Sequence, residues 1–303
     1  MNEVDLRPMT LGEVLDRTFK LYRSNFWVFA GIIALPYLLI LLVEVVSAGF
    51  GMGSKPAQAQ GIPQISPTLL AGAIAGGAVA GILYVVMAGA AHAATVFAVS
   101  DLYLARPANV RGSYSRVGVK VFRVLLIFLL IGLIVGVGFF LIMIAGIILR
   151  SPALMGLGII VFIVPCIIFV CRASVAVPVA MLEDLGAVRS LERSMQLTKG
   201  HAGQIFLIFL MVACLSYVAL LLLQAPFMAV AVSAAAAHQS PSFGVQILQY
   251  LSAFVSQVLV GPIATIAFSL MYYNLRVRKE AFDIQHLMAS LGPSTSPNAP
   301  SVA

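Results

Sequence analysis

Charged residues are scarce in this sequence, and their scarcity excludes most soluble folds. Only 10% of its 303 residues are Asp, Glu, Lys or Arg, while 61% are hydrophobic. Soluble domains are about one-quarter charged. The composition therefore predicts an integral membrane protein, and we expect an all-α, polytopic bundle of membrane-spanning helices.

Cysteine is also rare, and the short motifs of common catalytic centres are missing. Cys166, Cys171 and Cys214 all lie inside hydrophobic runs, so the sequence predicts no disulfide framework. It contains no HExxH, no Gly-x-Ser-x-Gly, no phosphate-binding loop and no His/Cys cluster with metal-ligand spacing. We therefore expect no cofactor and no metal, and we assign no catalytic residue.

Hydrophobic runs long enough for transmembrane helices follow one another along the chain, since such a helix needs roughly 20 residues to cross about 30 Å of hydrocarbon. No apolar stretch precedes the first charges, so we expect the first run to act as an uncleaved signal anchor. We predict a single integral membrane domain over residues 1–290 and a disordered, Pro/Ser-rich cytoplasmic tail over 291–303. The six predicted spans lie near residues 27–49, 69–99, 122–149, 153–182, 205–231 and 246–274.

A short amphipathic helix is predicted immediately before the first run, over residues 8–26. Thr10 and Glu13 have the spacing of a capping box, in which each side chain bonds the backbone N–H of the other residue. Apolar residues then recur at helical spacing, while residues such as Arg17 and Lys20 occupy the other face. Such a helix can lie in the plane of the lipid headgroups or pack on the protein's own cytoplasmic surface.

The amphipathic helix recurs later in the chain, so the sequence contains an internal repeat. Residues 15–25 (LDRTFKLYRSN) align without a gap to residues 191–201 (LERSMQLTKGH), and a fainter copy lies at residues 110–116. Each copy precedes two hydrophobic runs. We therefore predict two or three parallel repeats, each consisting of one cytoplasmic amphipathic helix and two spans.

The placement of the charges predicts the orientation of the spans. Every Lys and Arg except Lys55, Arg150 and Arg172 lies in or beside alternate segments: before the first run, between the second and third, between the fourth and fifth, and after the sixth. The positive-inside rule then predicts that both termini are cytoplasmic. These segments predict contact with anionic lipid headgroups or a membrane-protein partner, and not with nucleic acid. The candidate lipid- or partner-facing residues are Arg17, Lys20, Arg23, Arg189, Arg193, Lys199, Arg276 and Arg278.

Three ionisable residues inside the predicted spans form a candidate intramembrane polar site, because a charge in hydrocarbon is expensive. They are Arg172, His92 and Glu44. At 1.5 Å per residue, Glu44 lies about 27 Å from the start of its span, whereas Arg172 and His92 lie roughly 15 Å and 10 Å from the inner ends of theirs. His92 and Arg172 can therefore cluster near the inner leaflet. Each can also serve structure alone, and Arg172 extends to the inner interface if the fourth span ends early.

Glycines spaced by four residues predict close contacts between helices, because a residue without a Cβ atom lets two backbones approach. These glycines are Gly72, Gly76, Gly77 and Gly81 in the second run and Gly132 and Gly136 in the third.

Several segments of the chain carry a resemblance to a known family. They are residues 6–26 (LRPMTLGEVLDRTFKLYRSNF), 177–184, 194–200 and 272–283. These segments resemble the membrane-domain family named after glycerophosphoryl diester phosphodiesterase. The resemblance implies a bacterial inner-membrane protein of largely unassigned function, and not phosphodiesterase activity, since six spans leave no room for the soluble catalytic barrel. Asn274 and Ala281 stand where that family's pattern has Asp and Gly.

Three functions stay open at this level. The first is a structural or accessory scaffold whose basic cytoplasmic helices engage anionic lipid or a partner. The second is a transporter or lipid-handling protein with a polar site near His92 and Arg172, and the third is a membrane-embedded enzyme. The repeated basic helix favours the first, and the sequence does not determine the oligomeric state.

Overall fold

The computed structural model describes residues 8–49, 67–148, 150–236 and 242–280, and all regular structure in these residues is helical. Six of the helices are long and apolar enough to cross a membrane. The predicted all-α polytopic bundle is therefore confirmed, and the chain is a multi-pass membrane protein. The elements are α1 (Leu11–Ser24), α2 (Phe26–Gly49), α3 (Pro67–Tyr103), α4 (Val110–Ser115), the short 3-10 helix η1 (Gly118–Lys120), α5 (Val121–Ile148), α6 (Pro152–Ala173), α7 (Ala176–Leu182), α8 (Ala187–Leu197), α9 (Ala202–Ala236) and α10 (Phe243–Glu280). The predicted tail lies outside the described residues.

The order of the elements repeats along the chain in the way that the sequence alignment predicts. A short helix precedes two long helices in three places: α1 before α2 and α3, α4 before α5 and α6, and α8 before α9 and α10. At the start of α1 the capping box is formed, with the Glu13 carboxylate accepting from the Thr10 N–H at 2.6 Å and Thr10 Oγ1 accepting from the Glu13 N–H. This box satisfies two N–H groups that have no partner within the helix.

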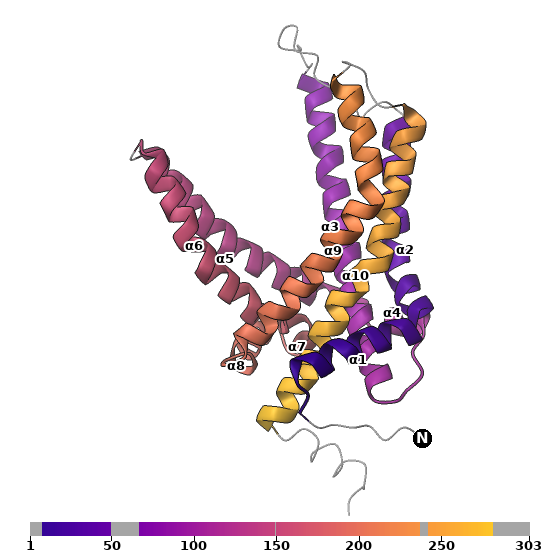
Figure 1. The fold of residues 1–303 in the computed structure, drawn as a ribbon, viewed down its shortest axis with the longest axis vertical. Helices are drawn as coiled ribbons and strands as arrows, with labels where there is room; N and C mark the ends of the chain where they lie inside the picture. Colours follow the sequence, from indigo (N-terminus) through magenta and orange to yellow (C-terminus); the bar gives the residue numbers. More distant parts are fainter. Residues whose placement is uncertain (1–7, 50–66, 149, 237–241, 281–303) are drawn as a thin grey trace, which may run out of the picture.

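Helix α10 occupies the centre of the bundle. It contacts α1, α2, α3, α7, α8 and α9, and Figure 1 shows it beside α9 and α2 with α1 crossing its lower half. The buried core is concentrated in the C-terminal halves of α3 and α10 and in α7, with side chains such as Phe97, Val179 and Leu270. The bundle is therefore packed most tightly at the end where the short helices lie.

The α5–α6 hairpin leans away from the other long helices toward its turn (Figure 1). α5 contacts α3, and α6 contacts α9. Most large apolar side chains of the hairpin are exposed, including Phe140, Ile147 and Ile160. A helix that is apolar on all sides is stable only where protein or lipid covers it, so this hairpin is suited to hydrocarbon.

The fourth predicted span, residues 153–182, corresponds to a candidate span over Gly156–Leu182, which is interrupted between α6 and α7. Pro178 gives the physical reason. A proline has no N–H to bond the carbonyl four residues earlier, here that of Ser174, and its ring clashes with that carbonyl in a continuous helix. The break places Arg172 in the last turn of α6.

Close glycine contacts occur at positions other than the predicted ones. The predictions for Gly81, Gly132 and Gly136 are wrong, because a Cβ atom added at any of them meets nothing within 4 Å. The α5–α6 hairpin is packed instead through Gly138, where a Cβ atom would lie 2.5 Å from the ring of Phe162. The surroundings of the other predicted glycines, in the first half of α3, lie outside the described residues.

A tyrosine of α4 compensates for the proline within α2. Pro36 has no N–H, so the carbonyl of Ile32 loses its donor inside the helix. The Tyr114 hydroxyl donates a hydrogen bond to that carbonyl at 2.6 Å. Burial raises the pKa of Tyr114 to about 12, so the hydroxyl stays protonated and can donate this hydrogen bond. This bond fastens the short helix α4 to α2.

Candidate functional site

The short helices and the basic residues gather at one end of the bundle. This end, which we call the basic end, contains α1, α4, η1, α7, α8 and the C-terminal end of α10 (Figure 1). All Lys and Arg residues of the described ranges lie in these elements or in the adjoining ends and loops, except Arg150. Arg150 lies in the α5–α6 turn, at the far end of that hairpin.

Charged side chains and one tyrosine form a network that joins α7, α8 and α10 at the basic end. Arg193 of α8 donates to the Glu183 carboxylate at 3.2 Å and also pairs with Glu280. Arg276 of α10 donates to Glu280 at 3.0 Å. Arg276 also donates to the Tyr272 hydroxyl at 3.2 Å, and that hydroxyl donates to Glu183 at 2.9 Å. We call these five residues the α7–α8–α10 network.

The α7–α8–α10 network balances its own charge, since two guanidinium groups face two carboxylates. The side chains of Glu183 and Arg193 are 16% and 30% exposed, and those of Arg276 and Glu280 are 19% and 20% exposed. Charges shielded from water to this degree are stable when they are paired and hydrogen-bonded. The candidate residues Arg193 and Arg276 therefore have structural partners, and they hold the end of α10 against α7 and α8.

A buried asparagine anchors the segment before α1 to α10. Asn274 is 1% exposed, and its side chain accepts from the N–H of Met9 at 2.8 Å and donates to the Met9 carbonyl at 3.1 Å. Arg278 donates to the same carbonyl at 2.6 Å. Both polar groups of the Met9 backbone are satisfied by α10, so the candidate residue Arg278 is also part of a structural contact.

Arg172 closes the C-terminal end of α8. Its guanidinium donates to the Met195 carbonyl at 2.9 Å, and its own carbonyl accepts from the Ser194 hydroxyl at 2.7 Å. Lys279 of α10 donates to the neighbouring carbonyl of Gln196 at 3.0 Å. Cations at this end of a helix satisfy carbonyls that lack an intrahelical donor and oppose the helix dipole. The position of Arg172 thus has a structural explanation.

His92 has partners of its own, and no contact joins it to Arg172 in the described residues. Its Nδ1 atom lies 2.8 Å from Thr265 Oγ1 on α10. Its ring meets the Phe128 ring of α5 nearly edge-on, with ring centres 5.7 Å apart. The structure therefore uses His92 to connect α3 with α5 and α10.

Arg17 lies against an aromatic stack that connects α1 with α3 and α10. Its guanidinium carbon is 4.8 Å from the centre of the Tyr103 ring, a cation–π distance. Tyr103 stacks on Tyr273 with ring centres 4.5 Å apart. The Tyr273 hydroxyl donates to Ser100 at 2.8 Å. These contacts hold α1 on the surface of the bundle.

Two acids neutralise further cations near the start of α5. Asp184 pairs with Lys120 at 3.1 Å and with Arg123. The hydrogen bonds from Arg123 and Lys120, with their positive charges, hold the pKa of Asp184 below its ordinary value. Asp101 of α3 pairs with Arg116 beyond α4. Acids from the ends of α3 and α7 therefore reduce the positive charge around α5.

Exposed cations remain at the basic end after this internal pairing. In the described part of the chain, the side chains of six of them have neither an ion pair nor a hydrogen bond. Arg278 and Lys279 are also exposed, but they donate to carbonyl groups of the protein. Asp16 and Glu192 are the exposed acids of the described residues without an ion pair. Four of the six cations belong to the candidates predicted from the sequence, which did not include Arg106 and Arg111. The six are Lys20, Arg23, Arg106, Arg111, Arg189 and Lys199.

Aromatic side chains lie exposed near two of these cations. Trp27, at the start of α2, is 84% exposed, and Phe19 of α1 is 39% exposed. A shallow hollow of about 530 Å³ on α1 is lined by Asp16, Phe19, Lys20, Arg23 and Ser24. Exposed tryptophan beside Lys and Arg is typical of the boundary between hydrocarbon and water.

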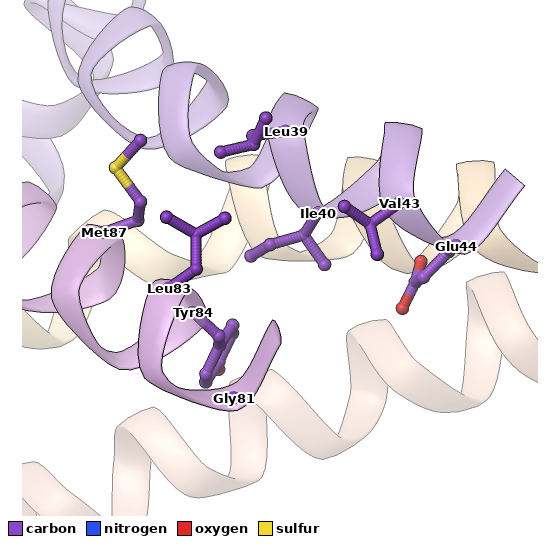
Figure 2. A pocket seen from close by; sticks show the side chains of 8 residues that line it. All are labelled: Leu39, Ile40, Val43, Glu44, Gly81, Leu83, Tyr84 and Met87. Carbon is purple, nitrogen blue, oxygen red and sulfur yellow. The ribbon is translucent and has the colours of Figure 1, made fainter. Parts of the chain in front are cut away.

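Glu44 lies near the opposite end of α2, away from the basic end. It closes one end of an apolar cavity of about 350 Å³ between α2 and α3. Figure 2 shows its carboxylate at the edge of this cavity and Met87 at the other end. The remaining lining residues are Leu39, Ile40, Val43, Gly81, Leu83 and Tyr84. The structure thus does not bring Glu44, His92 and Arg172 into one site.

A second cavity, of about 730 Å³, lies where α2, α3 and α4 meet. It is next to the cavity at Glu44, since Met87 lines both. Arg111 is the charged residue in its lining. The other lining residues are Leu35, Pro36, Ala90, Val110, Tyr114 and Ser115. We call this second cavity the Arg111 groove.

No group of three or more His, Cys, Asp or Glu side chains is placed to hold a metal ion within the described ranges. Comparisons of the chain with family models, with curated proteins and with solved structures find no match. Its function must therefore be inferred from the geometry of its own residues.

Proposed function

We propose that this protein is a scaffold of the bacterial inner membrane whose basic end binds anionic phospholipid headgroups at the cytoplasmic surface. The observation that carries the proposal is the division of the cations into two sets. One set is paired with the protein's own carboxylates and carbonyls, while the side chains of six exposed Lys and Arg residues of the basic end have neither an ion pair nor a hydrogen bond in the described ranges. The second set is available to external anions.

The paired set gives the basic end a fixed shape. The α7–α8–α10 network, the Asn274–Met9 contact and the Arg17–Tyr103 stack attach the short helices to α10 and α3. The exposed cations of α1 and α8 are consequently presented from helices that the bundle holds in place. This arrangement supports a scaffold, because lipid binding then requires no further ordering of the protein.

Electrostatic attraction makes the proposal quantitative. A basic residue near an anionic membrane surface contributes about 1 kcal/mol, and the attraction weakens with salt over a Debye length of roughly 10 Å at 0.1 M. Lys20, Arg23, Arg189 and Lys199 together should therefore give a clear preference for anionic over neutral lipid. Trp27, exposed beside α1, supports a location at the membrane boundary.

Spin-labelled lipids test the proposal in reconstituted protein. Electron paramagnetic resonance measures the fraction of labelled phosphatidylglycerol or phosphatidylcholine immobilised by the protein. The wild type should prefer phosphatidylglycerol, and replacement of Lys20, Arg23, Arg189 and Lys199 by Gln should remove most of that preference. Arg150→Gln is the matched control, since Arg150 is exposed at the other end of the α5–α6 hairpin. An undiminished preference in the fourfold variant would contradict the proposal.

The orientation is tested separately by reporter fusions at the C-terminus. The proposal expects a fused fluorescent protein to fold and a fused alkaline phosphatase to stay inactive, as both do in the cytoplasm. Phosphatase activity at that end would contradict the cytoplasmic placement of the basic end.

A further inference from the structure

The Arg111 groove combines an apolar wall with a single charged group at one end. Leu35 and Pro36 of α2 face Met87 and Ala90 of α3 across it. Leu35 is 58% exposed, so the protein itself does not cover this wall. The groove belongs to two membrane-spanning helices and ends at α4, which lies at the basic end (Figure 1). Its walls therefore suit an acyl chain that enters from the hydrocarbon.

The polar end of the groove offers one donor group to a ligand. The Tyr114 hydroxyl already donates to the Ile32 carbonyl at 2.6 Å, and the Ser115 hydroxyl donates to the Gly112 carbonyl at 2.9 Å. Arg111 is exposed, and its side chain has no ion pair or hydrogen bond in the described part of the chain. A guanidinium group binds phosphate through two parallel N–H bonds, which makes Arg111 a suitable partner for a headgroup phosphate.

The space beyond Met87 gives an acyl chain room to extend. The smaller cavity continues along α2 and α3 from that residue. On α2 the apolar lining of the two cavities runs from Leu35 to Val43, a distance of about 12 Å at 1.5 Å per residue. The groove therefore extends along the bundle in the direction that a lipid chain takes below its headgroup.

We propose that the Arg111 groove holds one anionic phospholipid molecule, with its phosphate on Arg111 and one acyl chain between α2 and α3. This inference rests on the proposed function, since it takes the basic end to lie at the headgroups. It adds a defined site for a single lipid to the more general attraction of the other exposed cations. The bound lipid would fill the junction of α2, α3 and α4 as part of the structure.

Native mass spectrometry of the protein released from detergent tests this site. With phosphatidylglycerol added, wild-type protein should retain one lipid at a collision energy that removes the others. Removing the donor of such a charge-assisted hydrogen bond lowers the affinity for the lipid by roughly tenfold or more. Arg111→Gln should therefore lower the retained lipid about tenfold, while Arg111→Lys, which keeps the charge, should lower it less.

Two matched controls distinguish lipid binding in the groove from the effect of losing any exposed positive charge and from the effect of introducing any large side chain. Arg106→Gln removes a nearby exposed cation that lines neither cavity, and it should leave retention unchanged. Ala90→Phe fills the groove and should abolish retention, whereas Ala213→Phe on the exposed surface of α9 should not. Thermal unfolding of each variant in detergent identifies any protein that is not folded, and Arg111→Gln, at an exposed position, should unfold as the wild type does.

The outcomes distinguish this inference from the proposed function. The proposal of an anionic lipid site in the groove would be overturned if Arg111→Gln retained as much phosphatidylglycerol as the wild type. It would also be overturned if the wild type retained phosphatidylcholine and phosphatidylglycerol equally. The fourfold Gln variant at residues 20, 23, 189 and 199 should still retain the single lipid, because none of those residues lines the groove. Loss of that lipid in the fourfold variant would also overturn the separate site.

Discussion

Replacing Asn274 with leucine should weaken the attachment of Met9, just before α1, to α10, and the loss of free energy of unfolding can be estimated from the contacts. Asn274 is 1% exposed, and its amide satisfies both the N–H and the carbonyl of Met9. Leucine fills a similar volume but offers no acceptor to the Met9 N–H. Leaving a buried donor unsatisfied costs roughly 1–3 kcal/mol. The Met9 carbonyl keeps its bond from Arg278, so the N–H accounts for most of the loss.

Asn274→Asp is the matched variant for this prediction. A carboxylate can still accept from the Met9 N–H, and it would lie beside Arg278, whose Nε atom is 3.3 Å from Asn274 Oδ1. We expect Asp to cost less free energy of unfolding than Leu, because its carboxylate keeps the bond from the Met9 N–H and gains the attraction of Arg278, which offsets the contact of its second oxygen with the Met9 carbonyl.

The free energy of unfolding of both variants can be measured by titration with sodium dodecyl sulfate in mixed micelles, followed by circular dichroism. Limited proteolysis before α1 gives a local readout, and the Leu variant should be cut faster there. If the two variants lower the free energy of unfolding equally, or if Asn274→Leu does not lower it, the bond between Asn274 and Met9 does not stabilise the protein as we expect.

Two further predictions concern contacts between α4, α5 and their neighbours. Tyr114→Phe removes the hydroxyl that donates to the Ile32 carbonyl, the group that Pro36 leaves without a donor, and it should lower the free energy of unfolding by roughly 1–3 kcal/mol. The matched change Tyr217→Phe, on the exposed surface of α9, should leave the free energy of unfolding unchanged in the same titration. Asp184→Asn should lower the melting temperature at neutral pH, because the paired Asp184 carboxylate has a pKa below its ordinary value of 3.8 and stabilises the fold only while it is ionised. This contribution is complete above pH 3.8 and is lost as the pH falls through the lower pKa of the folded state. The melting temperatures of the wild type and Asp184→Asn should therefore converge in acid. A difference between them that persists in acid would show that the ion pairs of Asp184 are not its source.

The sequence predicts the helices well because each is specified by local information. Long apolar runs give the spans, and Thr10 and Glu13 give the start of α1. The fourth span is present over Gly156–Leu182, and its division into α6 and α7 also has a local cause, Pro178.

The partners of the charged residues could not be predicted, because they depend on contacts between segments far apart in the chain. Arg193 meets Glu280 across 87 positions, and Asn274 meets Met9 across 265. Amphipathic patterning shows that a residue lies on a polar face, but it does not distinguish a face toward lipid from one toward a carboxylate. The same limit explains the glycines, since the spacing of Gly132 and Gly136 does not say which side of α5 meets α6. The resemblance to the phosphodiesterase-associated membrane-domain family stays a prediction.

The most direct test of lipid binding by the basic end is a salt titration of lipid selectivity. Electron paramagnetic resonance gives the ratio of the association constants for phosphatidylglycerol and phosphatidylcholine in reconstituted protein. Raising the salt from about 0.01 M to about 1 M shortens the Debye length from roughly 30 Å to 3 Å. The wild-type ratio should then fall toward one, and the fourfold Gln variant at residues 20, 23, 189 and 199 should start near one. A ratio near one in the wild type at low salt, or equal ratios in both proteins, would contradict the account.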